Sequence, residues 1–282
     1  MPVQLIADSG ATKCQWCLLS NGKKKIILTQ GISPYFLTRD QIVTLLQQEL
    51  MPDLKNADID TLHFYGTGLT NPANVKIVRI ALKELFPNTE IVLNDDLLGA
   101  ARALCGKKEG IACILGTGSN SCYYDGEKIL KNSPALGYVL GDEGSGAYLG
   151  KKVIQYYLYG TFDEDLAHRF NKQFGVSKDD ILTRVYKQPL ANRYLASYAI
   201  FLAENRGHYM IENIIEDGLN DFFFNHLYKY AQSWTLPINF TGSIAYGFKD
   251  VLQELCDTYE LELGNVFKSP MDGLVDFHTQ TA

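Results

Sequence analysis

The sequence predicts an α/β protein of two lobes, each following one βββαβαβα pattern, with a nucleotide cleft between the lobes. Three observations lead to this prediction. The chain of 282 residues is long enough for two ordinary domains with buried cores. Strand-like and helix-like patterns alternate along both halves, which is typical of α/β folds. One order of elements, namely a strand, a Gly/Ser/Thr turn, a strand and an Asn-Gly or Asp-Gly hairpin, occurs twice and indicates an internal repeat.

The first half opens with an apolar strand that ends in the turn Asp8-Ser9-Gly10-Ala11. A second strand runs to Asn21-Gly22, a dipeptide that predicts a tight β-hairpin. Thr38 is placed to cap a helix that ends near Pro52. The predicted strands are 3–7, 13–19, 25–29, 61–65 and 90–93, and the predicted helices are 39–50, 72–86 and 95–104.

The same pattern restarts near residue 111. An apolar strand leads into Gly116-Thr117-Gly118-Ser119, and Asp125-Gly126 predicts the second hairpin. The predicted strands are 111–115, 120–124, 127–130 and 237–240, and helices are predicted through most of 144–232 and at 244–257 and 269–277. We therefore expect an N-terminal lobe of residues 1–108 and a C-terminal lobe of residues 109–282. The second lobe would carry a helical insertion at about 144–232, and its last helix would pack back near the hinge.

Composition argues against several classes of function. A net charge of −6 is unfavourable for a protein that binds nucleic acid or an anionic membrane surface. The chain contains no run of ~20 apolar residues, the length that a membrane-spanning helix needs. The N-terminus reads as a strand rather than as a signal peptide, so we expect a cytoplasmic protein with no nucleic-acid and no membrane partner.

The six cysteines are expected to be free thiols, since disulfides are rare in a cytosolic chain of this size. Cys14 and Cys17 are spaced as CxxC but lie within a predicted strand. Side chains three residues apart on a strand point to opposite faces, so the two sulfurs would diverge. The five histidines show no spacing typical of metal ligands.

The turns that follow the first strand of each half are candidate phosphate-binding sites. The segments Asp8–Lys13 and Gly116–Asn120 are rich in small and hydroxyl residues, whose backbone N–H groups can converge on an anion. Neither matches the P-loop or a dinucleotide-binding GxGxxG motif. Asp8 is acidic, so it fits an outer-shell partner of Mg²⁺ better than a direct phosphate contact.

Three further positions are candidates for chemistry. Asp95 follows a predicted strand and starts a helix, where a carboxylate can act as a general base or simply cap the helix. The glycine-rich loop Gly141–Gly146 presents Asp142, which suits a polyol ligand or a helix cap. Gly242 joins a strand to a helix and would let a purine approach the backbone closely.

These motifs, in this order, resemble the N-acetylglucosamine kinase-like branch of the sugar kinase, actin and heat-shock chaperone superfamily, which is often grouped with the BadF/BadG/BcrA/BcrD ATPases. The resemblance covers nearly the whole chain and implies two actin-like (ribonuclease H-like) lobes. The motifs that carry it are DSGATK at 8–13, ND at 94–95, LGTGSN at 115–120, GDEGSG at 141–146, GSI at 242–244 and SPMDGL at 269–274.

The resemblance also implies a role for each matching residue. Asp95 would accept the proton of a hexosamine hydroxyl, at C6, and ATP with Mg²⁺ would be required. The ATP and phosphate site would comprise Gly10, Ala11, Thr12, Lys13, Thr117, Gly242 and Ser243. The sugar site would comprise Gly118, Asn120, Gly137 and Asp142. The chain departs from the family pattern at Leu136, where a Trp is common, and at Ser33, where an Asn is common.

The sequence thus predicts ATP-dependent phosphorylation of an amino sugar such as N-acetylglucosamine. Two alternatives stay open at this point: an ATPase of the dehydratase-activator type, which would hold an iron–sulfur cluster on thiolates, and a nucleotide or sugar sensor without catalysis. The expected partner is a small-molecule sugar, and a homodimer is also left open.

Overall fold

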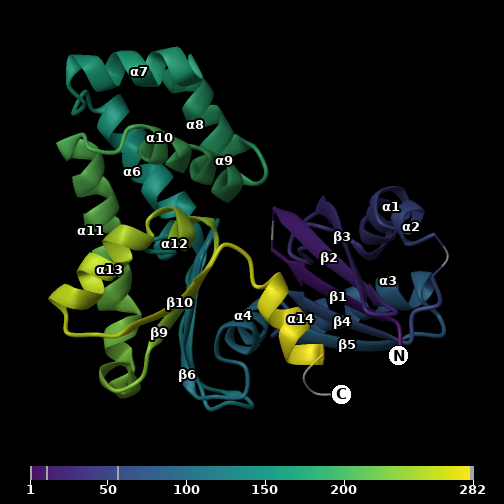
Figure 1. The fold of residues 1–282 in the computed structure, drawn as a ribbon. Coiled ribbons are helices and arrows are strands. Elements are labelled where there is room, and N and C mark those ends of the chain that lie inside the picture. The colour runs from purple at the N-terminus through teal and green to yellow at the C-terminus, as the bar shows by residue number, and fades with distance from the viewer. Residues whose placement is uncertain (1, 11, 56, 280–282) are drawn as a thin grey trace. The chain divides into compact units, whose positions relative to one another are not determined.

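The computed structural model describes residues 2–10, 12–55 and 57–279. The chain divides into two compact units, shown in Figure 1. The first unit comprises the chain up to Lys108, the short segment Asp125–Ile129 and the C-terminal segment from Ser269. The second unit comprises Glu109–Tyr124 and Leu130–Lys268.

The first unit is built on a five-stranded sheet in the order β3-β2-β1-β4-β5. Strands β1, β2 and β3 form an antiparallel meander, and β4 and β5 extend it in parallel with β1. The strands are β1 (Gln4–Ser9), β2 (Lys13–Ser20), β3 (Lys23–Gln30), β4 (Thr61–Gly66) and β5 (Glu90–Asp95). The predicted hairpin is confirmed, since Asn21 and Gly22 both adopt positive φ, at 50° and 73°.

Helices cover both faces of this sheet. One face packs against helices α1 (Arg39–Glu49), α2 (Met51–Leu54) and α3 (Pro72–Leu85), and the other packs against α4 (Asp96–Cys105) and α14 (Met271–Thr279). The alternation of strand side chains explains this division. On β2, Cys14 belongs to the first core and Cys17 to the second, so the predicted divergence of the two sulfurs is confirmed.

The second unit repeats the topology of the first. Its sheet has the order β10-β9-β6-β7-β8, in which β6 pairs antiparallel with β7 and parallel with β9. The strands are β6 (Gly110–Leu115), β7 (Ser119–Tyr124), β8 (Ile129–Ser133), β9 (Ile238–Thr241) and β10 (Leu263–Phe267). Strands β6 to β10 therefore correspond in order to β1 to β5, and the predicted duplicated α/β fold is confirmed.

Most helices of the second unit lie between β8 and β9. They are α5 (Gly137–Leu140), α6 (Gly146–Leu158), α7 (Glu164–Phe174), α8 (Lys178–Lys187), α9 (Ala191–Ser197), α10 (Ala199–Glu204), α11 (Tyr209–Asn225) and the 3₁₀ turns η1 (Leu227–Lys229) and η2 (Ala231–Trp234). After β9 follow α12 (Ser243–Gly247) and α13 (Lys249–Thr258). An apolar core rich in aromatic rings joins α6, α7, α10 and α11 to the sheet.

Several elements differ from the sequence-based expectation, among them β8, the helix after β9 and β10. Strand β8 begins later than predicted because Asp125 accepts hydrogen bonds from the backbone N–H groups of Glu127 and Lys128, which makes that segment a turn. The helix predicted at 244–257 is interrupted at Phe248. Strand β10 was not predicted, since its sequence shows no clean alternation of apolar and polar residues.

The last helix, α14, belongs to the first unit, whereas the sequence-based division ran the second lobe to residue 282. Its apolar face packs on α4 and on β1 and β2. Near its end, the ring of His278 stacks on His63 at 3.8 Å and shares a hydrogen bond of 2.9 Å with the Tyr65 hydroxyl. Burial, His63 and the Arg102 guanidinium lower the pKa of His278 to about 3. None of the described helices is long and apolar enough to cross a membrane.

Candidate functional site

In the first unit, the predicted phosphate and base residues gather where three neighbouring strands end. The register aligns Ser9 of β1, Gly66 of β4 and Asp95 of β5 in one row across the sheet. Gly10 closes the turn after β1 by donating its N–H to the carbonyl of Lys13, at 3.1 Å. The predicted residue Ala11 lies outside the residues that the structure describes.

Asp95 and Asp96 have different surroundings, although they are neighbours in the chain. Asp95 is the N-cap of α4, and its carboxylate accepts a hydrogen bond of 3.0 Å from the backbone N–H of Leu98. Asp96 is the first residue of α4, and its carboxylate is hydrogen-bonded to the side chain of Thr67. The capping role that the sequence left open for Asp95 is therefore present.

Asp96 and Asp8 form an acidic pair with perturbed ionisation. Burial and the charge of Asp96 raise the pKa of Asp8 to about 7, although Lys13 opposes this shift. Burial and the charge of Asp95 raise the pKa of Asp96 to about 6, against hydrogen bonds from the backbone and from Thr67. Two partly buried carboxyl groups repel each other unless a proton or a cation lies between them. Their chemistry fits a site for Mg²⁺, which prefers oxygen ligands and keeps several of its waters.

The segment after β3 closes this first half-site. The hydroxyl of Ser9 accepts the N–H of Ile32 at 2.9 Å and donates to its carbonyl at 3.2 Å. The next residue, Ser33, is buried, and its hydroxyl has no hydrogen-bond partner in the structure. The amide nitrogen of Asn94 on β5 is also buried without a partner. Buried polar atoms are nearly always satisfied in native proteins, so unsatisfied atoms indicate where a ligand can supply a partner.

In the second unit, the turn 116–119 and the loop 141–147 are joined by hydrogen bonds. The N–H groups of Gly146 and Ala147 donate to the carbonyls of Gly116 and Thr117, at 2.8 and 3.1 Å. The N–H of Ser119 reaches the carboxylate of Asp142 at 3.3 Å. These bonds bring the two glycine-rich motifs, which are more than 20 residues apart in sequence, into one half-site.

Asp142 lies at the centre of this half-site. A Cβ atom at Gly118 would lie 3.0 Å from an oxygen of Asp142, so only glycine fits comfortably there. Asp142 itself adopts a positive φ of 60°, a conformation that is uncommon for a non-glycine residue and often found at functional sites. Burial, followed by the charge of Glu143, raises its pKa against the hydrogen bond from Ser119.

Asn120, the second predicted sugar ligand, is oriented by a residue that sequence reasoning missed. Its side-chain oxygen accepts hydrogen bonds from the N–H of Ser121 and from the amide of Asn132 on β8, both at 2.9 Å. With its oxygen engaged in this way, Asn120 offers a ligand its amide nitrogen. No motif marks Asn132, because its role depends on the pairing of β8 beside β7.

Gly242 and Ser243 lie where β9 leads into α12. Gly242 adopts a φ of 120°, and a Cβ atom there would lie only 2.2 Å from the carbonyl oxygen of Leu115. A side chain is therefore excluded, and the backbone of this junction lies against the turn that follows β6. The hydroxyls of Ser119 and Thr241, on either side of this contact, are buried without a hydrogen-bond partner.

Gly137 is less closely joined to this half-site than the other predicted sugar residues. It adopts a φ of 73°, and its carbonyl accepts the N–H of Gly141 at 2.8 Å. The side chain of Leu136 would lie 3.0 Å from a Cβ atom at Gly141 and is 57% exposed. Val139 and Leu140 are more exposed still, so this short segment presents an apolar surface beside Asp142.

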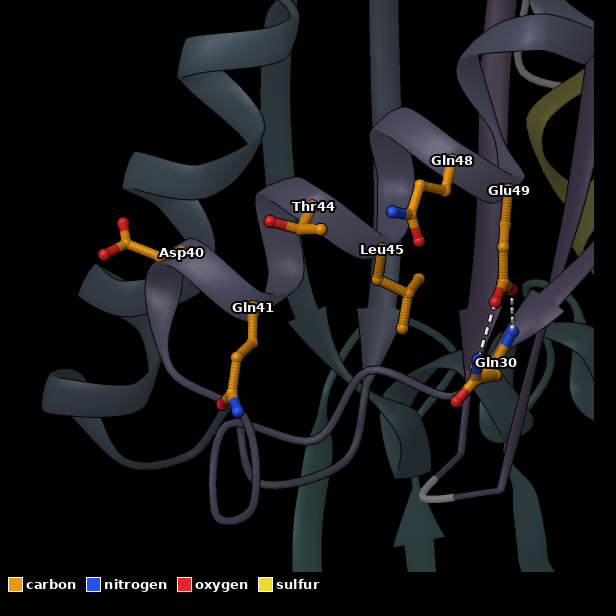
Figure 2. Close-up of a pocket in the computed structure, with 7 residues that line it drawn as sticks. All are labelled: Gln30, Asp40, Gln41, Thr44, Leu45, Gln48 and Glu49. Carbon is orange, nitrogen blue, oxygen red and sulfur yellow. Dashed lines mark hydrogen bonds between the residues drawn. The ribbon is translucent and has the colours of Figure 1, made fainter.

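A cavity of about 310 Å³ lies elsewhere in the first unit and includes none of the predicted site residues. Figure 2 shows its lining side chains, most of which project from α1, and the two hydrogen bonds between Gln30 and Glu49. The lining residues are Gln30, Asp40, Gln41, Thr44, Leu45, Gln48 and Glu49. The cavity is wide open, and nothing in its chemistry relates it to the glycine-rich motifs.

The described part of the chain offers little for metal or thiol chemistry. No group of three or more His, Cys, Asp or Glu side chains there is arranged to hold a metal ion. None of the six cysteines forms a disulfide in the structure, and five of them are buried.

Comparison with known proteins identifies the family. Over 99% of both chains, the protein is 40% identical to a candidate N-acetylglucosamine kinase from Porphyromonas gingivalis, and the two structures superpose with a TM-score of 0.94. A candidate N-acetylglucosamine kinase from Chromobacterium violaceum shares the fold at 16% identity, with a TM-score of 0.75 over 98% of this chain and 99% of that one. The ethanolamine utilization protein EutJ from Carboxydothermus hydrogenoformans shares it at 13% identity, with a TM-score of 0.52 over 97% and 88%.

No family model matches the chain, and no curated protein matches it. The relationship to the Porphyromonas gingivalis protein is nonetheless close and covers the full length of both chains. The chain therefore belongs to the N-acetylglucosamine kinase-like branch of the sugar kinase, actin and heat-shock chaperone superfamily.

Proposed function

We propose that this protein transfers the γ-phosphoryl group of ATP to the C6 hydroxyl of an amino sugar, with N-acetylglucosamine as the first candidate. The observation that carries the proposal is the acidic pair of Asp8 and Asp96 beside the turn that contains Lys13. A phosphoryl transferase needs cations to neutralise the phosphates and a carboxylate to orient the attacking hydroxyl. The relative from Porphyromonas gingivalis, named as a candidate kinase of this sugar, supports the choice of substrate.

We propose that the general base belongs to the Asp95–Asp96 pair. Position in the sequence led us to predict Asp95, and that assignment stays a prediction to be tested. Two observations support Asp96 instead. The carboxylate of Asp95 is already engaged in capping α4, and Asp96 is close enough to Asp8 to shift its pKa. A base with a pKa of about 6 is ionised at neutral pH and still accepts a proton readily.

The ATP and metal ligands follow from the motifs of both units. We propose that the phosphates bind Gly10, Ala11, Thr12, Lys13 and Thr117, and that the adenosine binds the backbone at Gly242 and Ser243. The unsatisfied hydroxyls of Ser119 and Thr241 support a polar ligand at this second group. Mg²⁺, when bound, would neutralise charge on the phosphates, and Asp8 would hold one of its water ligands.

The sugar would bind Gly118, Asn120, Gly137 and Asp142. Asp142 can accept hydrogen bonds from two hydroxyl groups, and Asn120 can donate one from its amide nitrogen. The exposed apolar side chain of Leu136 offers a wall for an acetyl methyl group. It is smaller and less rigid than an indole, so we expect modest discrimination between amino and N-acetyl sugars.

The proposal is tested by coupled measurement of ADP release from purified protein, ATP and Mg²⁺, with and without each sugar of a panel. The panel contains glucosamine, N-acetylglucosamine, N-acetylmannosamine and N-acetylmuramic acid. ADP release that depends on one sugar, with the sugar phosphate identified by mass spectrometry, supports the proposal. Sugar-independent ADP release would point to an ATPase that drives a partner, and ATP binding without turnover would point to a sensor.

A further inference from the structure

A buried chain of polar groups links the loop 141–146 to strands β7 and β8 in the second unit. Glu143 contacts His226 Nε2 at 3.3 Å, and His226 Nδ1 lies 3.4 Å from the hydroxyl of Ser121. That hydroxyl lies 2.9 Å from the hydroxyl of Tyr230, which accepts the N–H of Ser133 at 2.6 Å. This hydrogen-bond chain joins groups from residue 121 to residue 230, and neither the fold nor the proposed phosphoryl transfer accounts for it.

The protons of this chain can be ordered in one direction only if His226 is neutral. Glu143, when ionised, can only accept, so His226 Nε2 carries the proton and Nδ1 is the acceptor. Ser121 then donates its hydroxyl proton to Nδ1, and Tyr230 donates its hydroxyl proton to the Ser121 hydroxyl, with the Ser121 carbonyl as a second acceptor also 2.9 Å away. The N–H of Ser133 donates to the Tyr230 hydroxyl and is the first donor in this order. Every donor has an acceptor, and the chain ends on a carboxylate, the arrangement in which a buried network is most stable.

Packing holds the imidazole in the orientation that this order requires. His226 is only 2% exposed, and its ring stacks on Phe222 with a centroid distance of 4.6 Å. Phe222 also lies against Gly144, where a Cβ atom would approach within 3.0 Å. Burial lowers the pKa of His226 although the Glu143 carboxylate opposes the shift, so the neutral form is favoured.

Two members of this hydrogen-bond chain, Glu143 at one end and Ser121 in the middle, are next in sequence to two of the proposed sugar ligands. Glu143 follows Asp142 directly, and Ser121 follows Asn120 directly. We propose that His226 is a positioning residue of the sugar site, which holds Asp142 and Asn120 in a common register through Glu143 and Ser121. This inference rests on the proposed function for the identity of the ligand, but the coupling between loop and strand does not depend on it.

Such a role makes a specific prediction about kinetics. The ATP residues proposed in the first unit, and Gly242 and Ser243 in the second, are not members of this hydrogen-bond chain, so loss of His226 should raise the KM for the sugar more than the KM for ATP. His226→Phe preserves the ring volume but leaves Glu143 and Ser121 without their buried partner. We expect the KM for the sugar to rise on the order of tenfold, the effect typical of stranding a buried polar group.

His226→Gln serves as the rescue variant, because its amide supplies one donor and one acceptor at a spacing similar to that of imidazole. It should recover most of the sugar affinity. His168→Phe is the matched control, since His168 is an exposed histidine of the same unit. Hydrogen exchange of peptides covering 119–124 and 141–147 is measured on all variants, together with thermal unfolding.

In His226→Phe, we expect faster exchange in both peptides, no change elsewhere in the second unit and a selective loss of sugar affinity. Unchanged exchange in a folded His226→Phe protein would overturn the proposal, as would an equal rise of both KM values. If His226→Phe does not fold, His226→Gln is compared with the wild type instead, and a change of exchange in one of the two peptides without the other decides against the coupling. If no sugar supports turnover in the wild type, the proposed function fails, and the exchange data still decide whether the coupling exists.

Discussion

The choice between Asp95 and Asp96 as the catalytic base can be made with substitutions that separate capping from catalysis. Asn caps a helix about as well as Asp does, whereas Ala does not. Asp95→Asn therefore keeps the hydrogen bond to the N–H of Leu98 and removes only the negative charge. Asp96→Asn removes the proposed base and also relieves the repulsion between Asp96 and Asp8.

The magnitudes follow from these roles. Loss of a general base lowers kcat by about 10²–10⁴-fold, which we expect for Asp96→Asn. Asp95→Asn should change kcat less than about tenfold, because its capping bond survives. Asp95→Ala removes the cap and should lower the free energy of unfolding by about 0.5–2 kcal/mol. ATP affinity should stay near the wild-type value in both Asn variants.

The assay is steady-state ADP release over a range of sugar concentrations, with ATP binding measured separately by calorimetry. Wild-type activity should also fall as the pH drops through about 6, because Asp96 becomes protonated there. The reasoning is refuted if Asp95→Asn abolishes turnover and Asp96→Asn does not. That outcome would restore the assignment predicted from the sequence and would show that a capping carboxylate can also serve as the base.

Three further predictions concern other parts of the molecule. Asp8→Ala should weaken Mg²⁺-dependent activity more than sugar affinity, and an unchanged Mg²⁺ titration would exclude the metal role. Asp142→Ala should lower kcat/KM for every sugar more than Leu136→Ala does. The first change leaves polar groups without a hydrogen-bond partner, whereas the second only removes apolar contact. Equal effects of the two variants in the sugar panel would contradict this. The folded protein keeps His278 neutral at pH values below 6.5 at which the unfolded chain is protonated. The contribution of His278 to the free energy of unfolding should therefore be complete above pH 6.5 and should be lost as the pH drops towards 3. His278→Phe should remove ~1–2 kcal/mol of this acid loss, measured by chemical denaturation across this pH range. This is less than the full shift at ~1.4 kcal/mol for each pKa unit would give, because the ring is partly exposed to solvent. An acid loss that is the same in His278→Phe as in the wild type would contradict the prediction.

Several local features could be predicted from the sequence because neighbouring residues determine them. Asn21 and Gly22 accept positive φ at little cost, so the first hairpin forms wherever they follow a strand. Thr38 and Gln41 complete a capping box at the start of α1. The repetition of such signals in both halves was sufficient to predict the duplicated α/β fold, and the ordered motifs were sufficient to recognise the family.

The arrangement of side chains within each half-site depends on contacts between distant segments. Adjacent acids such as Asp95 and Asp96 look equivalent in sequence, and only the start of α4 makes one the cap and the other the neighbour of Asp8. Asn132 and His226 carry no motif, because their partners lie on other strands and loops. Hairpins and caps arise from forces between residues a few positions apart, so the sequence alone determined them. The ionisation of buried acids and the order of a buried hydrogen-bond chain arise from burial, which only the tertiary structure decided.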